Sequence, residues 1–226
     1  STEYDVPKDA WYYEQNAAPT MPYSVLMEIA LQPCGLLGAY LGSTLQFPDK
    51  NLYFRNLDGE GSLTDLDTDL RGKTIYNKAV LVSSVALGGT ILQQYTFECS
   101  VDGQVFYSGK SSFGFFPEAA LATQVGLDNG QDVAPWYQTE GLSPNDYTRI
   151  NLDSPFGKFK LFKAPATQPH WKLSGDQLLL IDNLKIVKEG GQYGKGYIHA
   201  NNPIKTYDWF FTCHFYQDPV MPSSVR

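Results

Sequence analysis

The sequence predicts an α+β protein in which an antiparallel sheet wraps around a buried helix. Residues 24–42 are apolar on nearly every side, which is typical of a helix enclosed in a core. Residues 73–116 hold three runs rich in Val, Phe, Tyr and Thr with turn signals such as Asp102-Gly103, and we expect three long antiparallel strands there. The 226-residue chain is 42% hydrophobic and 14% aromatic, so it can fill a folded core.

The predicted helix carries features that set its start and its surroundings. Ser24, just after Met21-Pro22, is typical of an N-cap residue, and Pro33 removes one backbone hydrogen bond in the middle of the helix. Three glycines along the segment allow a neighbouring element to come close: Gly35, Gly38 and Gly42. We therefore expect the sheet to approach this helix closely.

The remainder of the chain is less regular. Residues 117–169 are rich in Pro, Asn, Asp and Gly, which indicates a connector, with a short helix at 118–125. Two further strands are predicted at 177–187 and 195–200, because the segment KEGGQYG between them is a hairpin signal.

The composition argues against several classes of protein. The chain has 17 Lys and Arg against 24 Asp and Glu, a net charge of −7 and a pI near 4.9, whereas binding to a phosphate backbone needs clustered cations. The longest apolar runs are shorter than the about 18 residues that span a bilayer, and the N-terminus does not read as a signal peptide. We therefore expect no nucleic-acid partner, no membrane span and a cytoplasmic location.

The cysteines and histidines do not form a recognisable metal site. The cysteines are three in number and widely spaced, which is typical of reduced thiols rather than of a disulfide framework: Cys34, Cys99 and Cys213. No set of His, Cys and acidic residues has the spacing of metal ligands, and the sequence contains neither a nucleophile elbow nor a phosphate-binding loop. We predict no bound metal.

The two ends of the chain contain a weak internal repeat. Trp followed by two aromatic residues, and then Pro-x-Met-Pro-x-Ser, occurs at 11–24 and again at 209–224. His214 and Asp218 lie between these anchors in the second copy and have no counterpart in the first. The first copy leads into the predicted helix while the second stops at Arg226, so we expect an excerpt of a larger tandem assembly.

The second copy resembles a known active-site loop. The segment WFFTCHFYQDPVMPSS is similar to that of the bacterial 3-hydroxydecanoyl-acyl-carrier-protein dehydratase/isomerase family, in which an aromatic strand leads into His-Phe-x-x-Asp-Pro-x-Met-Pro-Gly. The match runs from His214 to Pro222, and Ser223 stands where the family has Gly. The preceding residues, LLLIDNLKIVKEGGQYGKGYIHANNPI, are similar to the strand pair before that loop.

The first half of the chain carries a second resemblance to the same family. The segment MPYSVLMEIALQ is similar to the family's helix, with Glu28 at the acidic position and Gln32 at the glutamine. In all, the similarity touches residues 12–116 and 170–224. The tandem arrangement is similar to the dehydratase region of polyunsaturated fatty acid synthases, and more so than to the single-unit enzyme.

The resemblance implies the hot-dog fold, as a double hot-dog or part of one. It implies a first unit at 1–116, with its central helix at about 24–42 and its strands at about 73–116. A connector at 117–169 then leads to a second unit at 170–226, of which the N-terminal strands and the active-site loop are present.

The resemblance also implies the chemistry of the site. Dehydration of a 3-hydroxyacyl thioester needs a base for the C2 proton and an acid for the C3 hydroxyl, because hydroxide is a poor leaving group. In this family the two groups come from different units, which pairs His214 with Glu28. Free N–H groups at a helix N-terminus can stabilise the enolate-like oxygen. Substrate-binding positions are implied at Tyr23, Gln32, Ser223 and Asp218.

The sequence thus predicts a (3R)-hydroxyacyl-acyl-carrier-protein dehydratase, with isomerisation of the 2-trans double bond to 3-cis left open. A hot-dog acyl thioesterase and a non-catalytic structural half of a megasynthase are the alternatives. No cofactor is expected, because the acyl group is carried on the phosphopantetheine of acyl carrier protein. The expected partners are acyl carrier protein, other synthase domains, and either a second copy of the chain or adjacent hot-dog units.

Overall fold

A computed structural model describes residues 1–64, 68–126, 129–154, 166–167 and 172–225. The chain divides into two compact units, and each is described by itself. Unit 1 comprises Ser1–Glu14, Thr20–Gln124 and His214–Arg226, and unit 2 comprises Gln15–Pro19 and Val125–Cys213. Residues 214–226 therefore belong to the same unit as the first half of the chain. The boundaries drawn from the sequence, 1–116, 117–169 and 170–226, stay a prediction.

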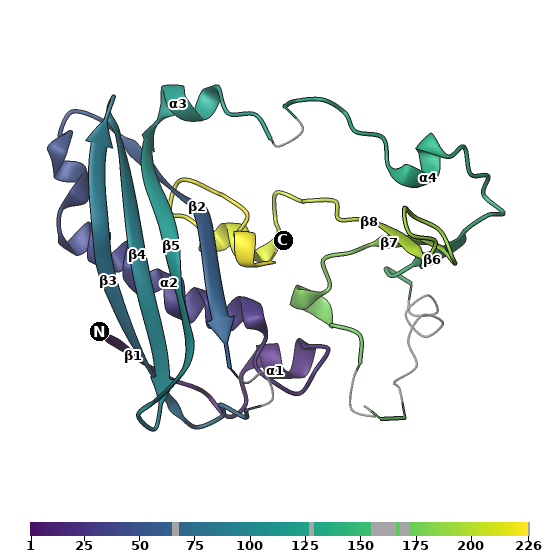
Figure 1. Cartoon of the computed structure of the whole chain (residues 1–226), viewed down its shortest axis with the longest axis horizontal. Helices are drawn as coiled ribbons and strands as arrows, with labels where there is room; N and C mark the ends of the chain where they lie inside the picture. Colours follow the sequence, from purple (N-terminus) through teal and green to yellow (C-terminus); the bar gives the residue numbers. More distant parts are fainter. Residues whose placement is uncertain (65–67, 127–128, 155–165, 168–171, 226) are drawn as a thin grey trace. The chain divides into compact units, whose positions relative to one another are not determined.

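Unit 1 is built on a five-stranded antiparallel sheet (Figure 1). The strand order is β1-β3-β4-β5-β2. The bounds are Thr2–Asp5 for β1, Leu52–Leu63 for β2, Thr74–Leu87 for β3, Thr90–Val101 for β4 and Gln104–Pro117 for β5. The three long strands predicted at 73–116 are confirmed, because β3, β4 and β5 pair in sequence through tight turns.

Strand β2 was not predicted from the sequence. Its centre contains Asp58, Gly59, Glu60 and Gly61, residue types that are depleted in strands. Pairing with β5 supplies what the local sequence lacks, since β2 is hydrogen-bonded along nearly its whole length to that strand, with a register shift between Asn56 and Asp58. The backbone partner, rather than side-chain propensity, determines this strand.

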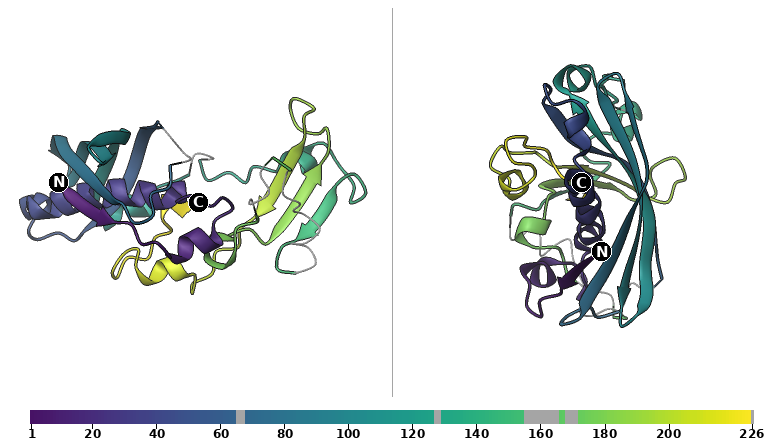
Figure 2. Two further views of the ribbon diagram at one scale, coloured as in Figure 1. Left: turned by 90° about the horizontal axis from the view of Figure 1, so that it is seen from below. Right: turned by 90° about the vertical axis from the view of Figure 1, so that its left-hand side faces the viewer.

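Helix α2, at Tyr23–Tyr40, packs on one face of this sheet. The right-hand view of Figure 2 shows the sheet curving around the helix. The architecture of a sheet wrapped around a central helix, implied by the resemblance, is therefore present in unit 1. The buried side of α2 repeats every four residues and consists of Leu26, Ala30, Cys34 and Gly38.

Two predictions made from the sequence for this helix were wrong. Ser24 lies inside it, because the carbonyl of Pro22 accepts hydrogen bonds from the N–H groups of Val25 and Leu26 and Pro22 is the N-cap. The helix is also not enclosed on every side, since Leu36 is 64% exposed.

Among the described residues, one helical segment, Tyr23–Gln46, is long and apolar enough to cross a membrane, a test that core helices also pass.

Two of the three glycines in this region are explained by their surroundings. A Cβ on Gly38 would lie 2.8 Å from Tyr95 Oη and 2.9 Å from Gln93 Oε1, so these two buried side chains would have to move for any residue other than glycine. Gly42 has φ +67° and begins the 3-10 turn η1, Ser43–Gln46. A Cβ on Gly35 would make an ordinary contact of 3.5 Å with the Phe54 ring. Close approach of the sheet is thus confirmed at Gly38.

A buried asparagine compensates for the proline inside α2. Pro33 has no N–H, so the carbonyl of Ile29 lacks its usual partner four residues on. Asn77 of β3 is 2% exposed, and its Nδ2 donates to the carbonyls of Ile29 at 2.9 Å and Ala30 at 3.0 Å. The sheet therefore supplies the hydrogen bond that the helix cannot make.

Unit 2 contains a three-stranded antiparallel sheet of order β6-β7-β8. The strands span Thr148–Asn151, Asn183–Val187 and Tyr197–Asn201. The short helices are α4 at Trp136–Thr139, and the 3-10 turns η2 at Asp176–Leu178 and η3 at Trp209–Thr212. Unit 1 adds α1 at Trp11–Gln15, whose last residue falls in unit 2, α3 at Glu118–Ala122 and η4 at Ser223–Val225.

Three expectations for this region need correction. The strand predicted at 177–187 begins at Asn183, because η2 and four residues without regular secondary structure, 179–182, precede it. The residues expected as connector contain β6, which pairs with β7. The aromatic segment at Trp209–Thr212 is a 3-10 turn rather than the strand implied by the resemblance.

Candidate active site

The loop that follows His214 is folded by its own hydrogen bonds. The Phe215 N–H donates to the Asp218 carbonyl at 2.8 Å, and the Asp218 N–H donates back to the Phe215 carbonyl at 3.2 Å. The Val220 N–H donates to the His214 carbonyl at 2.8 Å, and Gln217 takes the positive φ of +55° that closes the turn. Residues 214–220 therefore form one compact loop.

The ring of His214 is oriented by the same loop. Its Nδ1 lies 2.8 Å from the carbonyl oxygen of Val220. A carbonyl only accepts, so Nδ1 carries the hydrogen and Nε2 keeps its lone pair in the neutral ring. The ring of Phe215 packs on the imidazole with centroids 3.8 Å apart. The geometry selects the tautomer in which Nε2 is the proton acceptor.

Strand β2 holds the loop through two contacts. The guanidinium of Arg55 donates to both carboxylate oxygens of Asp218, from Nη1 at 2.6 Å and from Nη2 at 3.1 Å. One residue earlier, the Phe54 ring meets Phe215 edge to face with centroids 5.7 Å apart. Both oxygens of Asp218 are thus engaged by the protein itself.

Helix α2 holds the end of the loop. Ser224 Oγ donates to Glu28 Oε1 at 2.7 Å, and Gln32 Nε2 donates to Glu28 Oε2 at 3.3 Å. The carboxylate of Glu28 is half-buried and has a donor on each oxygen. Within the described part of the chain, no hydrogen bond or ion pair joins Glu28 directly to His214.

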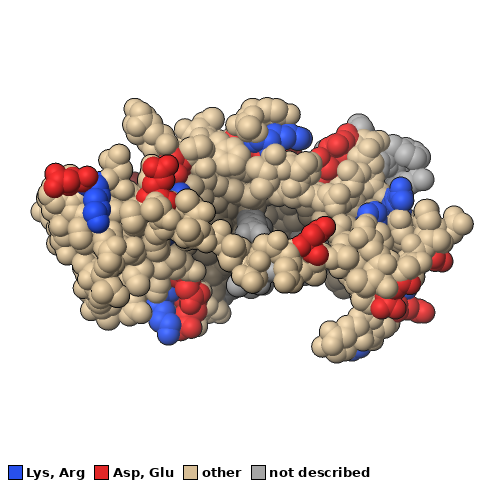
Figure 3. All heavy atoms as spheres, turned by 90° about the horizontal axis from the view of Figure 1, so that it is seen from above, with Lys and Arg blue, Asp and Glu red and all other residues tan. Residues whose placement is uncertain are grey.

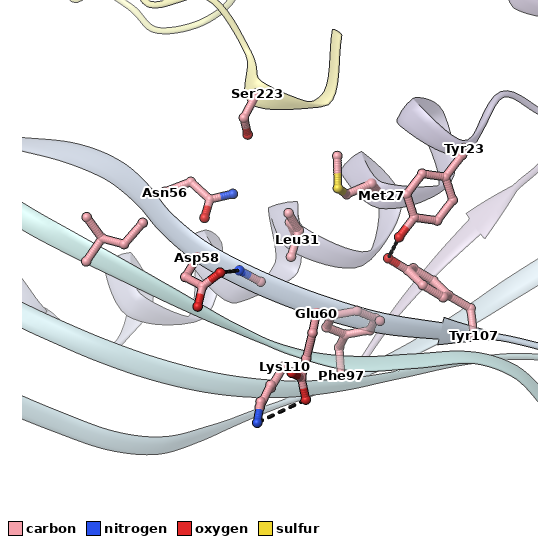
Figure 4. A pocket seen from close by; sticks show the side chains of 13 residues that line it. Tyr23, Met27, Leu31, Asn56, Asp58, Glu60, Phe97, Tyr107, Lys110 and Ser223 are labelled. Atoms are coloured by element: carbon pink, nitrogen blue, oxygen red, sulfur yellow. Dashed lines mark hydrogen bonds and ion pairs between the residues drawn. The ribbon is translucent and has the colours of Figure 1, made fainter. Parts of the chain in front are cut away.

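A pocket of about 290 Å³ lies between α2 and strand β2 (Figure 4). Its apolar wall includes Met27, Leu31 and Phe97, and its polar side includes Asn56 and Asp58 of β2, among other residues. Two predicted substrate-binding residues, Tyr23 and Ser223, line it, and the Tyr23 hydroxyl lies 3.1 Å from that of Tyr107.

Glu28 and Gln32 line a different hollow. This groove of about 500 Å³ runs between α2 and strands β1 and β3, and its walls include Leu36, Ile75 and Asn77. His214 and Asp218 line neither hollow. The structure therefore gathers the six predicted residues around α2 and the C-terminal loop of unit 1, but it does not place them in one pocket.

Two residues that hold this arrangement were not predicted. Arg55 lies in a strand that the sequence did not indicate, so no motif pointed to it. Ser224 is next to the matched position Ser223, yet its hydrogen bond to Glu28 spans 196 residues and has no local signature.

Two of the three cysteine thiols are buried. Burial raises the pKa of Cys34 to about 11 and that of Cys99 to about 12, so both are protonated at neutral pH and are poor nucleophiles. Cys213 is exposed, and all three cysteines are free. Among the residues that the structure describes, no group of three His, Cys, Asp or Glu side chains could hold a metal ion.

The surface charges are mixed on the face drawn in Figure 3. Lys and Arg atoms lie scattered between Asp and Glu atoms and form no continuous basic area among the residues drawn in colour there.

Comparison with known proteins finds one family model and one long relative that the chain resembles. Residues 173–226 match the family model of the FabA-like domain. The chain is 36% identical over 225 residues, or 99% of its length, to a polyunsaturated fatty acid synthase subunit from Thraustochytrium sp. (strain ATCC 26185 / S-3), of which it spans 15%.

Two solved structures show weaker likeness. A gentisyl-coenzyme A thioesterase is 15% identical, with a TM-score of 0.38 over 52% of this chain and 89% of that chain. An oleoyl thioesterase (putative) from Lactobacillus plantarum is 13% identical, with a TM-score of 0.38 over 86% of this chain and 79% of that chain. At such scores neither likeness carries an argument about activity. The family match and the relative bear out the resemblance found in the sequence: residues 173–226 are similar to the FabA-like domain, and the whole chain is similar to part of a polyunsaturated fatty acid synthase subunit.

Proposed function

We propose that unit 1 carries a dehydratase site that removes water from (3R)-hydroxyacyl thioesters in fatty acid synthesis. The observation that carries the proposal is the hydrogen bond from Ser224 to Glu28, which ties the His214 loop to the helix that bears the acid. The FabA-like match of residues 173–226 and the synthase relative support the same chemistry.

In this proposal His214 is the base. With Nδ1–H held by the Val220 carbonyl, Nε2 takes the C2 proton, whose removal the thioester carbonyl favours. The electron pair left on C2 forms the C2–C3 double bond as the C3–O bond breaks. The products are the enoyl thioester and water. The proton on His214 is released to solvent, and Glu28 takes up a proton from solvent before the next turnover.

Glu28 is the acid in the same step. A carboxylic acid donates its proton to the leaving C3 hydroxyl, which departs as water instead of hydroxide. The carboxylate that remains is stabilised by the donors already in place on its two oxygens, Ser224 and Gln32. In this proposal Gln32 therefore stabilises the carboxylate of Glu28 and does not bind the substrate.

The start of α2 supplies the third requirement. The N–H groups of Tyr23 and Ser24 have no acceptor four residues before them within the helix, so they are available to the enolate-like oxygen that develops on the thioester carbonyl. Tyr23 and Ser223 line the pocket beside this helix end, with Met27 and Leu31 as apolar walls for an acyl chain.

The partners belong to the same proposal. The relative is a synthase subunit of which the chain spans 15%, so we propose acyl carrier protein and neighbouring synthase domains as partners in the cytoplasm, with no resident cofactor. Strand β3 is a suitable edge for pairing with another hot-dog unit. In the described part of the chain, β1 pairs with β3 only at Thr74–Asn77, so the rest of β3 has β4 on one side and no paired strand on the other.

The test is turnover of a (3R)-hydroxyacyl pantetheine thioester by the 226-residue chain, followed by mass spectrometry of the product. We expect enoyl thioester from the unchanged chain and a loss of about 100-fold or more in His214→Gln and in Glu28→Gln. His199→Gln in β8 and Glu98→Gln on the exposed side of β4 are the matched controls and should retain activity.

Three outcomes would contradict the proposal. Turnover in the His214 and Glu28 variants equal to that of the unchanged chain would show that neither residue takes part in the chemistry. Release of the free acid would indicate a thioesterase. A correctly folded chain without turnover, both alone and with acyl carrier protein, would indicate a structural unit. The position of the double bond in the product decides whether isomerisation occurs.

A further inference from the structure

We propose that Arg55 is the positioning residue of this site, which fixes the His214 loop on strand β2 by holding Asp218. The inference rests on the proposed function for its catalytic consequence. Arg55 does not touch the reacting atoms in this proposal; it acts through the loop. Asp218, expected from the resemblance to bind substrate, takes the role of the loop's anchor.

The geometry of the pair is that of a fixed fork. Nη1 and Nη2 of Arg55 each donate to a different oxygen of Asp218, at 2.6 and 3.1 Å. Two parallel hydrogen bonds fix the orientation of the carboxylate as well as its distance. The side chains of both residues are 21% exposed, so water screens the pair less than it screens an open surface pair.

The fork is itself anchored to the sheet. Nη1 of Arg55 also donates to the carbonyl of Phe54 at 2.7 Å, so both hydrogens of this nitrogen are used within the protein. The guanidinium carbon lies 5.9 Å from the centroid of the Tyr53 ring. Arg55 is therefore held by its own strand before it meets the loop, and little side-chain freedom is left to lose.

The loop transmits this anchoring to His214. Asp218 is bonded through its backbone to Phe215 in both directions, and Val220 is bonded to His214 through its N–H and through its carbonyl. A loop closed in this way moves as one body. Fixing the Asp218 carboxylate on β2 therefore fixes the imidazole ring that Val220 orients.

The two other tethers cannot replace Arg55. The Phe54 and Phe215 rings are in contact but have no directional bond. Ser224 bonds Glu28 from a position ten residues after His214, beyond the closed part of the loop. Without Arg55 the loop stays near unit 1, but the angle of His214 is no longer set, and the Asp218 carboxylate lacks its cation.

The experiment compares four variants of the 226-residue chain. Arg55→Gln removes the charge and the fork, Arg55→Lys keeps the charge and loses the fork, and Asp218→Asn removes the anchor. Lys73→Gln is the matched control, because it also removes one cation from an ion pair, the exposed contact of Lys73 with Asp102 at 3.8 Å. Each is measured for kcat, KM, and the ¹⁵N and ¹H signals of the His214 ring.

We expect Arg55→Gln and Asp218→Asn to lower kcat about 10- to 100-fold with KM changed much less, since a small misplacement of a catalytic group has effects of this size. The Nδ1–H signal of His214 should shift or broaden in both. Arg55→Lys should recover part of kcat. A fifth variant, Arg55→Gln/Asp218→Asn, should lose little more than either single variant, because both changes break the same contact.

The result that overturns the inference is an unchanged kcat and an unchanged His214 signal in Arg55→Gln. A fall in folded fraction alone, with kcat per folded molecule and the His214 signal retained, also overturns it and leaves a structural ion pair. The ring signal is measured without substrate, so a chain that lacks dehydratase activity refutes the proposed function while the anchoring of His214 is still tested.

Discussion

Ser224 Oγ donates a 2.7 Å hydrogen bond to Glu28 Oε1 and so joins two residues that are 196 positions apart in the chain. The contact brings the end of the His214 loop onto α2 within unit 1. It also places a donor on the carboxylate to which we assign the acid role, which connects folding of the loop to the chemistry of the site.

Removal of the Ser224 hydroxyl should lower both the activity and the stability of the protein. In Ser224→Ala we expect kcat to fall about tenfold and the free energy of unfolding to fall by about 1 kcal/mol, the usual value of one hydrogen bond. Ser224→Thr keeps the hydroxyl and is the control. Steady-state kinetics and urea denaturation measure the two effects, and an Ala variant that equals the Thr variant in both would show that the contact is not needed.

Two glycines of α2 should respond in opposite directions. In Gly38→Ala the new Cβ meets Tyr95 Oη and Gln93 Oε1 at 2.8 and 2.9 Å, so we expect destabilisation of about 1 to 3 kcal/mol. Gly35→Ala has room, with Phe54 at 3.5 Å, and should gain up to about 1 kcal/mol from helix propensity. Urea denaturation of both variants tests the pair, and equal effects would contradict the close contact at Gly38.

Because Asn77 supplies the hydrogen bond that Pro33 cannot make, the stability effects of substituting these two residues should not be additive. Asn77→Ala leaves the partly buried Ile29 carbonyl without its donor and should cost about 1 to 3 kcal/mol. In Pro33→Ala/Asn77→Ala the new backbone N–H at position 33 can bond that carbonyl within the helix, so the loss caused by Asn77→Ala should be smaller on the Pro33→Ala background. A double-mutant cycle by chemical denaturation measures the coupling, and strict additivity would contradict it.

The buried thiols predict a loss of stability at alkaline pH. Burial raises the pKa of Cys34 to about 11 and of Cys99 to about 12 from 9.0. Above pH 9 the unfolded state has released these protons while the folded state keeps them, so the unfolded state binds fewer protons and stability falls with rising pH. The contribution is fully present below pH 9 and is lost as pH rises from there to the folded values.

Urea denaturation across this pH range measures how steeply the free energy of unfolding falls with pH. Each thiol can contribute a slope of at most about 1.4 kcal/mol per pH unit. The control is Cys34→Ala, in which the thiol of Cys34 no longer titrates, so the slope should be smaller between pH 9 and about 11. A slope that is the same in this variant would assign the alkaline loss to other groups, such as Tyr95, whose pKa burial raises to about 12.

The parts of the fold that the sequence predicted are those with a local signal. The apolar run at 24–42 and the Val, Phe and Tyr runs around Asp102-Gly103 indicated α2 and strands β3 to β5, since helix and hairpin signals depend on neighbouring residues. Strand β2 was missed, because Asp58 to Gly61 form a strand through pairing with β5. The resemblance implied a strand at Trp209–Thr212, yet these residues form a 3-10 turn.

The sequence by itself determined the residue types of the candidate site, because the loop from His214 to Pro222 is a short contiguous pattern. The tertiary structure decided that this loop lies on α2 and β2, that Val220 selects the tautomer of His214, and that Arg55 holds Asp218. Arg55 and Asp218 are 163 positions apart, and Glu28 and Ser224 are 196 apart. Contacts over such separations depend on how the whole sheet and helix pack, and no local pattern in the chain encodes them.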